Sequence, residues 1–285
     1  MTTAAPAPPP PLLLRVPGLS HAIRSPAWNC AIVTVALIVG LGLDTVVPKG
    51  WQPVLGLCAW LILLTLLVGA TPLERTQTGV VIVVATFFEV IGSIIWGVYV
   101  YRFDNLPMFV PPGHGMVYLF GLRLSQTAWG IRNRRRLVHA AIAGALGWAL
   151  LGLTVLERRD VAGAIGAVVL AAFLVRGRSA HVYAGVFFYV AALELYGTAI
   201  GTWYWLPEVP GLGVPNGNPP SGIAGGYVFF DIAAIALAPP LLAAWRRYRP
   251  GAPPVPAAVA VVSAAVDAPI VRQEAEPPGV REPRR

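Results

Sequence analysis

Charged residues are scarce in this chain of 285 residues. Only 12% are Asp, Glu, Lys or Arg, whereas soluble domains average about 25%. Hydrophobic residues account for 56%, so the composition excludes an ordinary soluble protein and indicates a lipid bilayer. The net charge of +8 does not indicate nucleic-acid binding, because the basic residues form short clusters at the ends of apolar runs.

Cysteine and the common catalytic motifs are also scarce or missing. The two cysteines, Cys30 and Cys58, fall in successive apolar runs and at different expected depths, which argues against a disulfide. The sequence has no G-x-S-x-G, Walker loop, H-E-x-x-H or prenyl-diphosphate aspartate motif. His114 is predicted on the opposite side of the membrane from the other histidines. We therefore expect no metal and no cofactor, and any chemistry must come from carboxyl groups.

Eight apolar runs approach the roughly 20 residues that a membrane-spanning helix needs. They lie near 27–47, 51–70, 79–101, 114–131, 137–155, 160–176, 181–205 and 222–245. The sixth is short enough to sit upright or only partly submerged. The sequence predicts an all-α polytopic membrane protein with about eight transmembrane helices.

The arginines predict the orientation of these helices. Most of them, including the cluster at 132–136, fall on the same side as the N-terminus if every run spans. The positive-inside rule then places both termini in the cytoplasm, as in a multi-pass protein of a bacterial-type plasma (inner) membrane. Residues 1–26 are rich in proline and are predicted to be a disordered arm. Residues 250–285 are predicted to be a disordered cytoplasmic tail rather than a ninth span.

A pattern in the third run recurs in the seventh. E-V-I-G-S begins at Glu89 and E-L-Y-G-T at Glu194, and each is followed by an aromatic end and a proline corner, VPPGHG or VPNGNP. An ungapped comparison places Tyr99 on Tyr204. We interpret this as a duplication that gives two parallel four-helix halves, 27–136 and 137–249. Any cavity should lie between the halves.

Four charged residues are predicted near the middle of the membrane: Glu89, Arg123, Glu194 and Asp231. A charge at the bilayer centre costs about 2.5 to 3.5 kcal/mol on insertion scales, so these side chains should face inward. We expect Glu89 to pair with Arg123, and Glu194 to share a proton with Asp231. The cluster is a candidate for catalysis or for proton-coupled transport. The alternative is a polar clamp between helices, with Arg123 shared among the carboxyls.

Candidate substrate-binding residues lie at the predicted outer ends of these helices, except Gln126, which is expected to complete the hydrogen bonding of the charged cluster. They are Tyr99, His114, Gln126, Trp203, Tyr204 and Asn218. His114 is expected well above Glu89, where it would cap a helix at the interface or else bind a headgroup or relay a proton. The aromatic residues would either anchor the interface or line a cavity and stabilise a cation through their π faces.

The E-x-x-G pattern, the Y-V-Y and W-Y-W ends and the proline corners resemble the repeated hairpin of polytopic carotenoid-hydratase-type membrane proteins of carotenoid biosynthesis. The resemblance implies acid-catalysed chemistry on an isoprenoid chain. It covers only the two hairpins and its glycine spacing differs, so no residue role is transferred. Three hypotheses remain: an enzyme acting on a lipid or isoprenoid, a proton-coupled transporter, and a membrane scaffold subunit. The expected partners are membrane lipids and an apolar small molecule.

Overall fold

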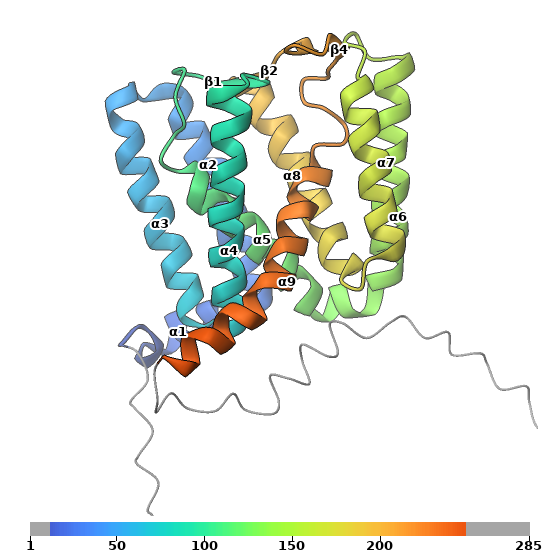
Figure 1. Ribbon diagram of the computed structural model, residues 1–285. Coiled ribbons are helices and arrows are strands. Elements are labelled where there is room, and N and C mark those ends of the chain that lie inside the picture. The colour runs from blue at the N-terminus through green and yellow to red at the C-terminus, as the bar shows by residue number, and fades with distance from the viewer. Residues whose placement is uncertain (1–11, 249–285) are drawn as a thin grey trace, which may run out of the picture.

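The computed structural model describes residues 12–248, which form a bundle of helices capped at one end by short strands (Figure 1). The helices are α1 (Pro17–Arg24), α2 (Pro26–Val46), α3 (Gln52–Val68), α4 (Pro72–Glu89), α5 (Val110–Gln126), α6 (Ala128–Thr154), α7 (Val161–Arg176), α8 (Ala180–Ala199) and α9 (Ala224–Arg247). A π-helical turn, Val90–Ile95, continues α4, and 3-10 turns cover Leu12–Arg15 and Lys49–Trp51. The strands are β1 (Tyr99–Tyr101), β2 (Trp203–Trp205), β3 (Glu208–Val209) and β4 (Val214–Pro215). We call the end that carries β1 and β2 the strand end.

Six helices within residues 12–248 are long and apolar enough to cross a membrane. They are α2, α3 with its preceding turn, α4 with its π turn, α6, α8 and α9. The other two predicted spans are shorter: α5 has 17 residues, and α7 has 16, which confirms the expected shortness of the sixth run. The helices carry many exposed Leu, Ile and Val side chains, as lipid-facing surfaces require. The fold is that of an all-α, multi-pass membrane protein.

Two predicted helix boundaries are wrong, and local capping explains both. Helix α4 begins at Pro72 rather than near 79, because Thr71 and Glu74 form a reciprocal capping box. The turn between α5 and α6 lies at Thr127, whose hydroxyl accepts the Gly130 amide at 2.9 Å. The arginine-rich segment 132–136, predicted as the loop between the two halves, is therefore part of the continuous helix α6.

The predicted disordered N-terminal arm is partly helical. Within residues 1–26, α1 occupies Pro17–Arg24, and Ile23 at its end is buried. A side chain at Gly69, directly after α3, would collide with Ile23, so the glycine permits close contact between the ends of α1 and α3. The remaining parts of the predicted arm and tail, 1–11 and 250–285, lie outside the described residues.

Four helices form the centre of the bundle. Helices α4 and α8 each pack against both α5 and α9. Helices α2 and α3 cover one side of this group, while α6 and α7 cover the other (Figure 1). Gly121 of α5 and Gly185 of α8 lie where these helices cross, and an added methyl group at Gly121 would lie 2.5 Å from Val186. Small residues thus let the central helices approach closely, as membrane bundles require.

The predicted spans 79–101 and 181–205 do not remain helical to their ends. Their last residues form the antiparallel pair β1 and β2, in which Val100 lies opposite Tyr204. Gly97 and Gly201 have φ values of +70° and +78°, which end the helical segments before the strands. The alternation in Y-V-Y and W-Y-W is typical of strands, and an apolar run alone does not distinguish the two structures.

The two segments before the strands correspond locally, with a shift of one residue. The hydroxyls of Ser93 and Thr198 donate to the carbonyls of Glu89 and Glu194, at 2.8 and 2.7 Å. The ring of Tyr99 lies against Gly92 of its own segment.

The equivalent contact in the second segment shows which residues match. The ring of Trp203 lies against Gly197, so Tyr99 corresponds to Trp203 and not to Tyr204. The wide π turn at Val90–Ile95 accommodates the extra residue of the first segment, because each π hydrogen bond spans one more residue than an α bond.

The proline corners, in contrast, are different structures. VPPGHG forms the first turns of α5, where proline is tolerated because the first helical amides have no partner in the helix. VPNGNP contains strand β4 and a cis peptide bond between Asn218 and Pro219. The prediction that these are equivalent corners is wrong.

Asp160 holds the long segment 206–223, between β2 and α9, to the bundle. Its carboxylate accepts the amide of Gly163 at the start of α7, and the amides of Gly217 and Ser221, at 2.7 to 2.9 Å. We expect Asp160→Ala to lower the free energy of unfolding by roughly 3 kcal/mol or more, since it leaves buried amides without an acceptor. Glu157→Ala, at an exposed position, is the matched control. Equal stability of the two variants in detergent denaturation would contradict this role.

Candidate functional site

A cavity of about 120 Å³ lies at the strand end, below β1 and β2. Its walls come from α2, α4, α5, α8 and α9, so it lies between the two predicted halves of the chain. Most of the lining is apolar or aromatic. The acidic side chains that reach it are Glu89 and Glu194.

Glu89, the last residue of α4, is held by three side chains. Its Oε2 accepts the hydroxyls of Tyr99 and Tyr101 at 2.7 and 2.8 Å. Its Oε1 lies 2.8 Å from Nε2 of His114, on α5. Three partners fix the orientation of this carboxylate and compensate for its burial.

Glu194 occupies the corresponding position on α8 and is held by a different pair of donors. Its Oε2 accepts the indole N–H groups of Trp203 and Trp205 at 2.9 and 3.1 Å. Oε1 has no hydrogen-bond partner within residues 12–248. Because Glu194 lines the cavity, this oxygen is available to a molecule bound there.

Both glutamates are nearer the strand end than predicted. The sequence prediction put each glutamate about 18 Å from the outer end of its span, on the assumption that the helices continue to Tyr101 and Trp205. The helical segments instead end at Ile95 and Ala199, and the strands fold back over them. At 1.5 Å per residue, Glu89 lies about 9 Å and Glu194 about 8 Å from these ends.

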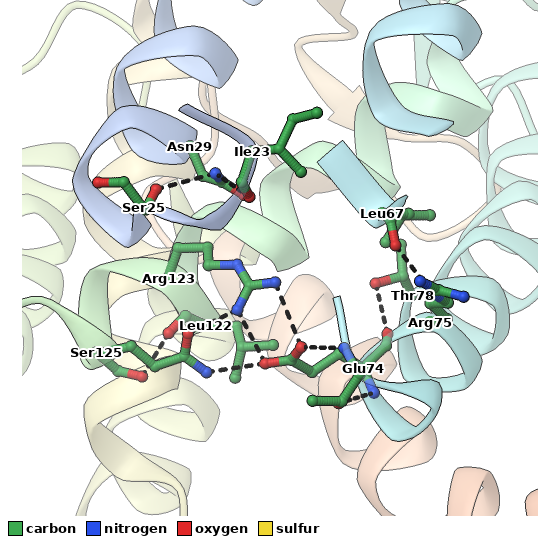
Figure 2. A network of polar contacts seen from close by, with 12 residues as sticks. Ile23, Ser25, Asn29, Leu67, Glu74, Arg75, Thr78, Leu122, Arg123 and Ser125 are labelled. Atoms are coloured by element: carbon green, nitrogen blue, oxygen red, sulfur yellow. Dashed lines mark hydrogen bonds and ion pairs between the residues drawn. The ribbon is translucent and has the colours of Figure 1, made fainter. Parts of the chain in front are cut away.

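The predicted pairing of Glu89 with Arg123 is wrong. Arg123 Nη1 lies 2.9 Å from Glu74 Oε1 and also donates to Gln126 at 2.7 Å. The Gln126 amide in turn donates to Glu74 Oε1 at 2.9 Å. Figure 2 shows the guanidinium directed at the Glu74 carboxylate, close to the start of α4. This network joins α4 to α5 toward the end opposite the strands and does not reach the cavity.

Asp231 is also separate from the cavity. It lies on α9, is 2% exposed, and its Oδ2 has no hydrogen-bond partner. No hydrogen bond joins it to Glu194, whose Oε2 is occupied by the two indoles. The predicted Glu194–Asp231 pair, and the clamp in which Arg123 serves all the carboxyls, are therefore not formed.

His114 is the largest correction among the predicted substrate-binding residues. It is buried, lines the cavity and contacts Glu89, whereas the sequence placed it above Glu89 as a cap. Glu89 lies near the end of its helix and α5 already begins at Val110, so the two residues reach the same level. The His114 ring also lies 5.1 Å from the ring of Tyr227.

The other predicted substrate-binding residues divide into two groups. Tyr99 and Trp203 line the cavity. Tyr204 is 50% exposed, because strand alternation turns it away from its neighbours, and Gln126 belongs to the Arg123 network. Asn218 accepts the Trp205 amide at 2.9 Å and so fixes the loop against β2.

Four more aromatic side chains line the cavity: Tyr101, Trp205, Tyr227 and Phe230. The sequence left the first three open between an interface belt and a cavity wall, and Phe230 was not predicted. The period-two aromatic pattern after Gly97 and Gly201 was the available signal for the first two, since it places alternate rings on one side of a strand. Glu74 was missed as a charge partner, although the T-P-L-E capping sequence indicates that its helix begins there.

Within residues 12–248, no three His, Cys, Asp or Glu side chains lie close enough to hold a metal ion. Comparison of the chain with protein-family models, with curated proteins and with solved structures finds no match.

Proposed function

We propose that this protein is a membrane-embedded enzyme that carries out acid–base chemistry on an apolar lipid, with an isoprenoid as the substrate class that the sequence resemblance implies. The observation that supports this proposal best is the free Oε1 of Glu194 in an aromatic cavity. A carboxyl oriented by fixed donors and shielded from water is suited to proton transfer in such a site.

The surrounding residues have distinct roles in this proposal. Glu194 transfers the proton, and Glu89 balances charge from the other wall while His114 and the two tyrosines keep it in place. The rings of Trp205 and Tyr227 line the cavity and offer π faces to a developing positive charge. Arg123 then has a structural role, since it lies outside the cavity.

The local match between the Glu89 and Glu194 segments supports an internal duplication. Matching hydroxyl bonds and matching ring-on-glycine contacts place one carboxylate from each segment in the same cavity. We infer that the two segments descend from one ancestral hairpin. The arginine cluster at 132–136, near the start of α6, further supports an orientation with the strand end away from the cytoplasm.

A proton-coupled carrier is the second candidate. The observation that favours it is the π turn directly after Glu89, because π turns within helices occur often at functional sites and carriers place their substrate sites at interrupted helices.

Lipid extracts of a strain lacking the protein, compared by mass spectrometry with the same strain carrying the wild type, test the enzyme proposal. We expect one lipid to accumulate in the deletion strain and to be consumed when the wild type is restored. The double variant Glu89→Gln and Glu194→Gln should reach the membrane and leave that lipid unconsumed. Identical lipid profiles in all three strains, together with a defect in uptake, would replace the enzyme by the carrier.

A further inference from the structure

A second hollow, of about 470 Å³, lies along α2 and α3 on the side of the bundle that carries exposed apolar residues. We call it the lateral groove. Its lining consists of apolar side chains, Gly40 and the thiol-bearing Cys58. Nothing in this lining carries a charge, so the groove offers no site for a polar headgroup.

The lateral groove adjoins the carboxylate cavity, because the two share part of their walls. Leu37 and Leu41 of α2 and Phe109, just before α5, line both hollows. The shared residues are apolar side chains whose rotamers can change without breaking a hydrogen bond. A molecule in the groove is therefore one layer of side chains from Glu89 and Glu194.

Small residues open the groove. Ala36 and Gly40 lie one turn apart on the same face of α2, and Ala59 lines the groove from α3. The groove residues of α2 run from Trp28 to Leu43, which is about 22 Å along the helix axis. That length covers most of the roughly 30 Å hydrocarbon core of a bilayer.

The two hollows differ in volume, and each suits a different part of a long lipid. The inner cavity, at about 120 Å³, is smaller than the roughly 300 Å³ at which small-molecule sites begin. It can hold the reacting end of a lipid but not the whole molecule. The adjoining groove has the volume and the apolar surface that the remainder of such a substrate requires.

We propose that the lateral groove binds the long apolar chain of the substrate, which enters sideways from the bilayer and passes Leu37, Leu41 and Phe109 to place its reacting end beside Glu194. This inference rests on the proposed function. It assigns the substrate class by shape: a molecule with a long unbranched or isoprenoid hydrocarbon chain and a reactive group near one end.

Binding of the fluorescent fatty acid cis-parinaric acid to the purified full-length protein in lipid nanodiscs tests the groove. We expect saturable binding by the wild type and about tenfold or more weaker binding by Gly40→Phe, whose side chain fills the groove. Gly147→Phe on α6 is the matched control, because a Cβ atom added at either glycine meets no atom within 4 Å. Ala59→Phe provides a second block from α3.

The outcomes separate the groove from the proposed reaction. Glu194→Gln should keep wild-type binding of cis-parinaric acid while losing conversion of the lipid. If both groove-filling variants bind the probe and convert the lipid as well as Gly147→Phe does, the groove inference is wrong and the proposed function stands. If Gly40→Phe and Ala59→Phe lose probe binding and the wild type still alters no lipid, the groove stands as a chain-binding site and the enzymatic function is wrong.

Discussion

Glu194→Gln is expected to slow conversion of the lipid substrate by about 10²- to 10⁴-fold, the range typical of a lost general acid or base. The amide has the size of the carboxylate and keeps an oxygen for the indoles of Trp203 and Trp205. It cannot supply or accept the proton. The measurement is turnover, in membrane vesicles, of the lipid that accumulates in the deletion strain.

Two comparisons make this result specific. Glu208→Gln on β3 changes an exposed carboxylate near the same end of the molecule and should leave turnover unchanged. Trp203→Phe removes one of the two indole donors and should slow turnover less than Glu194→Gln, since Trp205 still holds the carboxyl group. Wild-type turnover by a folded Glu194→Gln protein would remove Glu194 from the reaction.

Arg123→Met is expected to lower the free energy of unfolding by about 3 to 5 kcal/mol, because it leaves the buried carboxylate of Glu74 without its cation. Glu74→Gln should also destabilise the protein, because it leaves the buried guanidinium of Arg123 without its anion. The glutamine still accepts the Thr71 amide, so the helix cap is preserved. Stability can be followed in mixed micelles by titration with sodium dodecyl sulfate.

The double variant Glu74→Gln and Arg123→Met completes a thermodynamic cycle. We expect it to be less destabilised than the sum of the single changes, since no uncompensated charge remains. Arg132→Met, at an exposed position on α6, controls for the loss of an arginine and should alter stability little. Additive effects of the two single changes would show that Glu74 and Arg123 do not act as a pair.

The membrane fold was predictable from the sequence because its determinants are local. A run of about 20 apolar residues is sufficient to indicate a spanning helix, whatever its neighbours are. The cost of burying charge also showed that Glu89 and Glu194 should face inward, and the shared glutamate-glycine pattern linked their two segments. Local rules did not reveal where the helical segments end, since the residues of β1 and β2 are as apolar as those of a helix.

The partners of the buried charges were decided only by the tertiary structure. Depth along a helix cannot distinguish Glu74 from Glu89 as the partner of Arg123, because the choice depends on where α4 starts and how α5 lies against it. His114 meets Glu89, and Asp231 remains apart from Glu194, for the same reason. Sequence by itself determined which residues must be buried. The packing of α4, α5, α8 and α9, with the one-residue shift of the π turn, determined which of them meet.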